Sequence, residues 1–309
     1  MEHAEATDRL RMAGRAAHSR HTYVWLRSAL ILLGRDRVAL VGLTVIGCTI
    51  LAAVCAPVLS PADPIHNSLL DRLTPPMWAA GGTPRYPLGT DTLGRDVLTR
   101  LLYGARVSLI VGLSAVVISG LLGVVLGLVS GYYGGRVDDV LMRLGDIQLA
   151  FPILVLAIAI LAVLGASLVN VILVLGLSGW VTYARIVRGE TLSLKQREFI
   201  AAAHGLGAPD RIILWRHILP NVLPPVTVVA TFSVARIIIA EASLSFLGLG
   251  VPPPTPSWGA MLDEGRNYIT TGWWLAMFPG LAILLLVLGI NLVGDWVRDV
   301  LDPRMERGM

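Results

Sequence analysis

The chain of 309 residues carries little charge and almost no lysine. Only 15% of its residues are Asp, Glu, Lys or Arg, and Lys195 is the single lysine beside 24 arginines. A Walker A loop needs a lysine followed by Ser or Thr, because that lysine reaches the nucleotide phosphates. Gln196 follows Lys195, so the chain is not itself an ATPase. Zinc-protease, Cys-x-x-Cys and nucleophile-elbow patterns are also absent from the sequence, and we predict no catalytic residue, no metal ligand, no cofactor and no enzyme activity.

Cysteine is equally scarce. The two cysteines, Cys48 and Cys55, lie seven residues apart in one apolar run. A helix that rises ~1.5 Å per residue would separate them by ~10 Å. This separation is too long for a disulfide bond, and we predict two free thiols within one helix.

Hydrophobic residues, in contrast, dominate the chain. They make up 55% of it, and the mean hydropathy is +0.70, well above the values of soluble globular proteins. The net charge of +4 is small, and we attribute it to orientation in a membrane and not to nucleic-acid binding. The predicted fold class is an all-α membrane protein in contact with lipid.

Long runs without charge predict six transmembrane helices, because a bilayer core needs ~20 apolar residues per span. Residues 147–184 form one run of 38 uncharged residues, which is too long for one span and is divided near Gly165. The predicted spans therefore lie in residues 38–59, in 107–135, twice in 147–184, in 222–249, and in a last run that ends near Val293. A short charged loop is predicted after the second span, and a Pro-rich outer segment from Val251 to Trp274 after the fifth.

The polar stretches divide the chain further. We predict a tail in residues 1–37 that ends in a basic amphipathic helix over 25–37, and the first span in 38–59. An extracytoplasmic segment in 60–106, a five-helix core in 107–298 with a polar loop in 189–220, and a second tail in 299–309 follow. Six spans place both termini on one side, and that side carries 18 Lys and Arg residues against six on the other. Because cytoplasmic loops are the basic ones, both termini are predicted to be cytoplasmic.

The region from Glu198 to Asn221 is a polar island in this apolar chain, and it predicts two short helices with a break. The first helix has apolar residues at the i, i+3, i+4, i+7 spacing of one face, namely Phe199, Ala202, Ala203 and Leu206. Gly207 suits the left-handed backbone of a helix end. Pro209 and Asp210 suit the first turn of a second helix, which Pro220 is expected to end.

This island resembles the cytoplasmic loop of permease subunits in binding-protein-dependent ABC importers. The loop of that family reads Glu-Ala-Ala, three residues, Gly, nine residues, Ile-x-Leu-Pro. The matching positions here are Ala202, Ala203, Gly207, Leu219 and Pro220. Ala201 stands in place of the Glu and His217 in place of the Ile, and whether Glu198 takes over the contact of the missing Glu stays open.

Two further stretches are similar to the C-type subunit of dipeptide and oligopeptide importers. They are Leu-Gly-Thr-Asp-x-x-Gly-Arg-Asp in residues 88–96 and Glu-Ala-Ser-Leu-Ser-Phe-Leu-Gly-Leu-Gly-Val in residues 241–251. The resemblance implies the type I ABC importer permease fold, preceded by an interfacial elbow helix, in the cytoplasmic membrane of a bacterium. It further implies a B-type permease partner, two ATPase subunits that bind ATP and Mg, and an extracytoplasmic substrate-binding protein.

The resemblance also assigns roles. It implies that the chain forms half of a pathway for di- or oligopeptides, although nickel and other small-solute importers share these stretches. The helix from Glu198 to Leu206 would be the coupling helix that docks on an ATPase subunit. The residues implied in coupling are Glu198, Phe199, Ala202, Ala203, Leu206, Gly207, Leu219 and Pro220.

Arg236 and Glu241 are ionisable residues inside the fifth predicted span, and charges at membrane depth are functional candidates. Five residues apart on a helix they point ~140° away from each other, so they are not a simple pair. We predict that Arg236 faces the interior of the bundle or the partner permease, and that Glu241 lies where water reaches it. Both are candidates for the translocation pathway. They also leave open a secondary transporter driven by an ion gradient.

Overall fold

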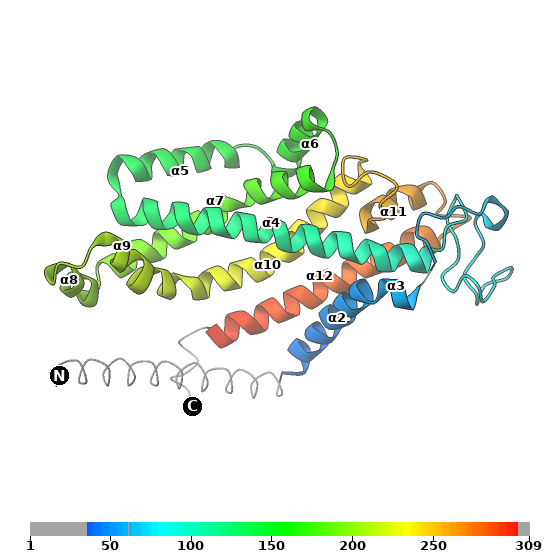
Figure 1. The fold of residues 1–309 in the computed structure, drawn as a ribbon, viewed down its shortest axis with the longest axis horizontal. Helices are drawn as coiled ribbons and strands as arrows, with labels where there is room; N and C mark the ends of the chain where they lie inside the picture. Colours follow the sequence, from blue (N-terminus) through cyan, green and yellow to red (C-terminus); the bar gives the residue numbers. More distant parts are fainter. Residues whose placement is uncertain (1–35, 61, 302–309) are drawn as a thin grey trace, which may run out of the picture.

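The computed structural model describes residues 36–60 and 62–301, which form an elongated helical bundle (Figure 1). The elbow helix predicted for residues 25–37 lies outside the described residues except for its last two positions, which cap and begin the first described helix. Residues 302–309 of the second tail lie outside them as well.

The described elements are helices, and five of them are long and apolar enough to cross a membrane. Two shorter helices, α5 and α6, meet at an angle of 85° and form a sixth span if they count as one. If this pair is counted as one span, the structure has the six spans that the sequence predicted, and the all-α fold is confirmed. In chain order the elements are α2 (Arg37–Val54), α3 (Ala56–Leu59), η1 (Leu69–Asp71), α4 (Val97–Tyr133), α5 (Gly135–Leu149), α6 (Ile153–Leu164), α7 (Leu168–Lys195), α8 (Glu198–Gly205), α9 (Asp210–Ile212), the π-helical turn η2 (Ile213–Ile218), α10 (Leu219–Phe246), α11 (Trp258–Arg266) and α12 (Trp274–Leu301).

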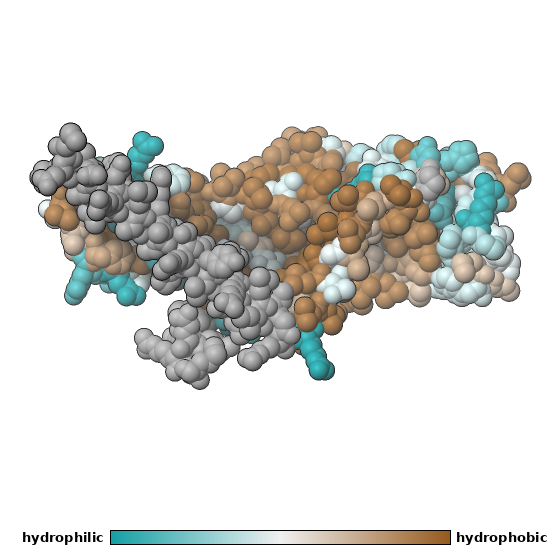
Figure 2. All heavy atoms as spheres, turned by 60° about the horizontal axis from the view of Figure 1, so that its bottom comes forward, coloured by the Kyte–Doolittle hydropathy of each residue, from teal (hydrophilic) through white to brown (hydrophobic). Residues whose placement is uncertain are grey.

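The bundle has two distinct ends. The short helices α8 and α9 lie at one end, and α11 lies with residues 62–96 at the other, so we name them the α8 end and the α11 end (Figure 1). On the face shown in Figure 2, hydrophobic residues cover the coloured surface between the two ends, whereas hydrophilic residues gather mainly near the ends. A hydrophobic middle with polar ends is the arrangement that a bilayer stabilises.

Side-chain caps set where several helices begin. Asp36 accepts hydrogen bonds from the backbone N–H groups of Val38 and Ala39 at the start of α2. Asp96 caps α4, Ser167 caps α7 and Ser257 caps α11 in the same manner. Each cap supplies an acceptor for one or two of the N–H groups that the first turn of a helix leaves without a partner.

Helices α4 and α7 pack with their backbones in close contact. A Cβ atom added to Gly127 would lie 2.6 Å from the carbonyl oxygen of Ala184, and one added to Gly131 would lie 2.7 Å from the Cβ of Thr191. Such distances are shorter than van der Waals contact. Small residues at this interface therefore permit the close approach, as is common between membrane helices.

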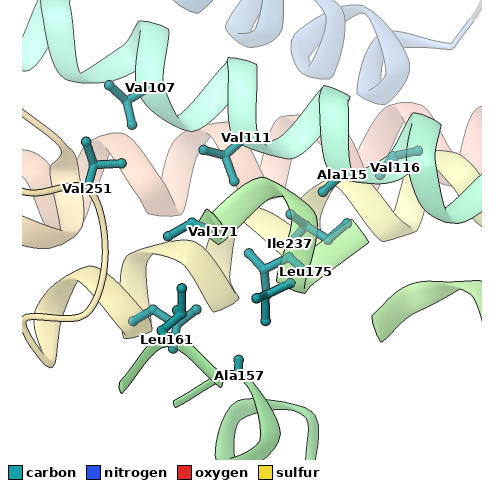
Figure 3. Close-up of a cluster of buried hydrophobic side chains, with 12 residues drawn as sticks. Val107, Val111, Ala115, Val116, Ala157, Leu161, Val171, Leu175, Ile237 and Val251 are labelled. Atoms are coloured by element: carbon teal, nitrogen blue, oxygen red, sulfur yellow. The ribbon is translucent and has the colours of Figure 1, made fainter. Parts of the chain in front are cut away.

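A hydrophobic cluster joins α4, α6, α7 and α10 near the middle of the bundle. Val111 and Ala115 of α4 lie across from Leu175 of α7 and Ile237 of α10, and Leu161 attaches the short helix α6 (Figure 3). Those five side chains are at most 9% exposed. The cluster fixes α6 against the long helices although α6 alone is short.

Three predicted boundaries before α7 are wrong. The second span begins at Val97 and not near residue 107, because Asp96 caps a helix that continues without a break to Tyr133. The polar stretch after it is the helix α5 and not a loop. The third span reduces to α6, whose 12 residues extend only ~18 Å and cannot cross a ~30 Å bilayer core alone. The turn at Gly165, with φ of +83°, lies where the sequence predicted it.

Further differences concern the second half of the chain. Pro220 does not end a helix, because η2 continues directly into α10 and Pro220 lies in its first turn, where a proline needs no N–H partner. The outer segment contains the helix α11, which the sequence did not predict. Finally, α12 extends to Leu301, beyond the end predicted near Val293.

Candidate functional site

Helix α8 is anchored through one side chain and leaves others exposed. Ile200 is 1% exposed and packs in a cluster with Ile213, Ile218 and Tyr132, whereas Ala203 lies at the edge of that cluster. In contrast, Phe199 is 47% exposed and Leu206 is 89% exposed, and Ala202 and Glu198 are exposed as well. The predicted apolar face is therefore mostly turned away from the protein, and Ile200 is an anchor that the sequence analysis missed.

A sharp turn separates α8 from α9. Gly207 has φ of +76°, in the left-handed region that residues with a side chain rarely adopt. The preceding turn closes with hydrogen bonds from the N–H groups of Leu206 and Ala208 to the carbonyl oxygens of Ala202 and Ala203, at 3.0 and 3.1 Å. The predicted break at Gly207 has the backbone that was expected of it.

Tyr132 connects this turn to the end of α4. Its hydroxyl donates a hydrogen bond of 2.7 Å to Asp210, in the first turn of α9. The same hydroxyl lies 3.2 Å from Nε2 of His204 in α8, and the two rings are stacked. The Lys195 ammonium donates to the backbone carbonyl of Tyr132 at 2.5 Å. The ends of α4 and α7 and the two short helices are therefore held together by one side chain and its backbone.

Leu219 and Pro220 lie at the junction of η2 and α10. Neither is buried, whereas the neighbouring Ile218 and Val222 are fully buried. The Ile-x-Leu-Pro positions of the loop therefore mark the point at which the chain leaves the α8 end and enters the membrane span.

Arg236 lies in the middle of α10 and lines a pocket of about 340 Å³ between α4, α5, α6, α7 and α10. The side chain donates one hydrogen bond of 3.2 Å, from Nη2 to the hydroxyl of Ser233. Within residues 36–60 and 62–301, Arg236 forms no ion pair with any Asp or Glu. The guanidinium is thus turned into a pocket at membrane depth and keeps most of its donors unused.

Glu241 occupies a different environment. It is 0% exposed and accepts hydrogen bonds from Ser245 at 2.7 Å and from Ser108 of α4 at 3.4 Å. The expectation that water reaches Glu241 is wrong in this chain, because its side chain is fully buried. Its carboxyl group accepts from both α4 and α10 and so links the two helices.

The α11 end contains a group of charged side chains that the sequence analysis did not identify. Asp91, Arg95 and Arg100 are each less than 10% exposed, and they meet Glu264 of α11. We name these four residues the α11-end ion cluster. It attaches α11 and the loop before α4 to the first turn of α4.

These features define the class of the protein. A bundle of five or six membrane helices, with short helices exposed at one end and an ion-paired cap at the other, is typical of a membrane component and not of a soluble enzyme. The family model described as binding-protein-dependent transport system inner membrane component matches residues 123–307. A second model, the N-terminal TM domain of oligopeptide transport permease C, matches residues 25–76. The chain therefore belongs to the family of binding-protein-dependent transport system inner membrane components.

Relatives and a solved structure agree with this assignment. The di/tripeptide transport system permease protein DppC of Pseudomonas aeruginosa is 45% identical over 87% of this chain and 88% of its own length. The oligopeptide transport system permease protein OppC of Bacillus subtilis is 39% identical over 91% and 90%. The inward facing MetNI methionine ABC transporter has a similar fold, with a TM-score of 0.52, 20% identity, and coverage of 65% of this chain and 96% of that one. The resemblance to the C-type peptide permeases is confirmed.

Proposed function

We propose that this chain is the C-type permease subunit of a bacterial importer of di- and oligopeptides, and that it forms half of the translocation pathway. The observation that carries the proposal is the 45% identity to a di/tripeptide permease subunit over nearly the whole chain. The match of residues 25–76 to the N-terminal domain of an oligopeptide permease supports the same substrate class.

The proposal requires partners at each face of the bundle. A B-type permease subunit completes the pathway, and two ATPase subunits bind ATP and Mg at the α8 end. A substrate-binding protein delivers peptides at the α11 end. ATP hydrolysis takes place in the ATPase subunits, because this sequence contains no Walker A lysine.

Helix α8 is the coupling element in this proposal. The side chains of Phe199 and Leu206 are exposed at the α8 end. An amphipathic helix commonly binds by placing such side chains in a hydrophobic groove. The ATPase subunit would supply that groove, and Gly207, Leu219 and Pro220 would set the path from α8 into α10. Glu198, Ala202 and Ala203 complete the docking helix.

The α8 end faces the cytoplasm in this proposal, and both termini lie on that side of the bacterial cytoplasmic membrane. The excess of basic residues on the predicted cytoplasmic side supports this orientation. The ATPase subunits require it, because ATP is supplied in the cytoplasm.

Reconstitution of the five-component complex in liposomes tests the function. We expect uptake of a radiolabelled dipeptide that requires both ATP and the loaded binding protein, and no uptake of nickel. Phe199→Asp should abolish co-purification of the ATPase subunits, because it places a charge in an apolar groove. Ala201→Glu is the matched control, since it adds the same charge to α8 at the position where the family loop has Glu. Uptake that persists without ATP and collapses with the proton gradient would identify a secondary transporter instead.

A further inference from the structure

The pocket beside Arg236 contains polar groups of two kinds. The first kind is already hydrogen-bonded within the protein. Gln148 donates to the carbonyl oxygen of Ser178 at 2.6 Å and accepts from the Trp180 indole at 2.7 Å. The hydroxyls of Ser119 and Ser178 donate to backbone carbonyl oxygens of α7. These groups shape the wall and have little capacity left for a ligand.

The second kind consists of donors without a sufficient acceptor. Arg236 has five N–H donors and uses one hydrogen bond, to Ser233. Tyr183, which is 1% exposed and lines the same pocket, has a hydroxyl without a hydrogen-bond partner in the described chain. The Tyr183 hydroxyl is buried without an acceptor, which costs free energy, whereas Arg236 is exposed and offers its remaining donors to the pocket. A pocket that concentrates such donors is complementary to an anion.

The pocket walls carry no opposing charge. Arg236 is the only ionisable side chain other than Tyr183 among the residues that line it, and no Asp or Glu is among them. A divalent cation would meet a guanidinium there and no carboxylate, which is the opposite of what such cations bind. The charge of the pocket therefore argues against a metal cargo.

Lipid headgroups are a poor source of this anion. Arg236 lies ten residues before the end of α10 at Phe246, which corresponds to ~15 Å along a helix. Phosphates of the bilayer lie at its surface, outside the hydrocarbon core. A solute that crosses the membrane reaches the depth of Arg236, whereas a headgroup does not.

We propose that this pocket is a subsite for the C-terminal carboxylate of the peptide in transit, bound by the guanidinium of Arg236 with the Tyr183 hydroxyl as a second donor. The proposal rests on the peptide-import function proposed above. The pocket volume of about 340 Å³ is near the lower end of the ~300–1,000 Å³ that small-molecule sites occupy, so it holds one end of a peptide. Such a subsite accepts peptides with any side chains, because every peptide with a free C-terminus has this carboxylate.

The test compares Ala-Ala with Ala-Ala amide in liposomes that contain the complete complex. Each compound is supplied at a concentration that saturates the binding protein, as measured separately by calorimetry. We expect wild type to import the free acid about tenfold faster than the amide, the factor for one hydrogen bond to a charged group. Arg236→Gln should import both at the slow rate with an unchanged half-saturating concentration of binding protein. Arg236→Lys should restore most of the preference, because it retains the positive charge.

Two further variants keep the test decisive. Tyr183→Phe removes an oxygen that has no partner, so the fold is retained, and we expect a smaller loss of the preference for the free acid. Arg298→Gln removes the same charge from an exposed position in α12 and should change nothing. The proposal is overturned if wild type and Arg236→Gln show the same preference for the free acid over the amide. It is also overturned if Arg236→Gln loses the B-type subunit while Tyr183→Phe behaves as wild type, because Arg236 would then lie in the subunit interface. No import of Ala-Ala by wild type would instead overturn the peptide-import function itself.

Discussion

Glu264 of α11 binds the guanidinium of Arg100 with both oxygens of its carboxylate. The distance from Nη1 to Oε2 is 2.6 Å and the distance from Nη2 to Oε1 is 2.9 Å. Arg100 also donates to Asp91, which in turn accepts from Nε of Arg95 at 2.6 Å. A bidentate pair fixes orientation as well as distance. The α11-end ion cluster therefore sets the position of α11 against the first turn of α4, 164 residues away in sequence.

The first prediction concerns this cluster. Asp91→Asn should destabilise the protein by about 3–5 kcal/mol, because it leaves buried guanidinium groups without full neutralisation. Glu264→Gln should cost less, since the Glu264 side chain is 29% exposed and water can replace part of the interaction. Thermal unfolding in detergent measures both. Asp263→Asn, which breaks the exposed pair with Arg266, is the control and should change stability by less than about 1 kcal/mol. Equal stability of Asp91→Asn and the control would contradict the prediction.

The second prediction compares two glycines of the α8 turn. A Cβ atom at either Gly205 or Gly207 would meet no other atom within 4 Å, and only Gly207 has a positive φ. Gly207→Val should therefore reduce ATPase co-purification and uptake while the protein still inserts in the membrane, because valine strains this backbone. Gly205→Val has the same side chain in the same open space and should retain both activities. If the two variants behave alike, the left-handed turn is not what the coupling helix needs.

The third prediction concerns the link between α4 and the short helices. Tyr132→Phe removes the hydrogen bond to Asp210 and the contact with His204, and the ring packing stays. We expect a loss of about 1.5–3 kcal/mol, the range for a hydrogen bond to a charged group, and faster hydrogen exchange in α8 and α9. Tyr133→Phe changes an exposed neighbour and serves as the control. Unaltered exchange in α8 would show that Ile200 alone holds the helix.

The fourth prediction is a pH dependence in the segment between α3 and α4. The Asp71 carboxylate accepts hydrogen bonds from the hydroxyls of Ser68 and Tyr86, at 2.7 and 2.8 Å, and these donors lower its pKa below the ordinary value of 3.8. A lowered pKa stabilises the folded segment above that ordinary value, and the contribution is lost as the pH falls through the lowered pKa.

Hydrogen exchange in residues 62–96, corrected for its intrinsic pH dependence, should therefore rise only below about pH 4. Tyr86→Phe removes one donor and should raise exchange already at neutral pH. Asp63→Asn is the control, because the Asp63 carboxylate accepts from the nearby backbone of Ile65 and, among the residues that the structure describes, from no side chain. An identical profile in all three proteins would show that Asp71 does not hold this segment.

The fifth prediction is topological. With six spans and both termini cytoplasmic, an alkaline phosphatase fused after Met309 should be inactive and a fluorescent protein at the same point should be bright. A second fusion within residues 76–84, at the α11 end, should give the opposite pattern. An active phosphatase after Met309 would reverse the orientation proposed here.

Local chemistry explains which features could be predicted. Gly165 and Gly207 take positive φ, which glycine adopts without steric cost because it has no Cβ, and hydropathy locates the long spans. The start of α4 and the helix α5 could not be predicted from lack of charge, since both contain charged residues that find partners elsewhere. Arg188 of α7, for example, donates to Asp138 of α5 at 2.6 Å.

The candidate site residues could also be predicted only in part from the sequence. Spacing identified Phe199 and Leu206 as an apolar pair, but only the fold shows that Ile200 is the side chain that faces inward. Arg236 was recognised as a charge at membrane depth, and its position in a pocket depends on four other helices. Glu241 is buried and accepts a hydrogen bond from Ser108, which lies 133 residues earlier in the chain.

The close packing of α4 and α7 has a mechanical consequence. Backbones that touch at Gly127 and Gly131 cannot slide or twist past each other without steric overlap, so we expect the two helices to move together. Tyr132 of α4 contacts α8 through His204, so a displacement imposed at α8 should shift α4 and α7 as a pair. We then expect changes of spacing during transport between this pair and the helices around it, and cross-links between α4 and α7 should leave the transport cycle free to run.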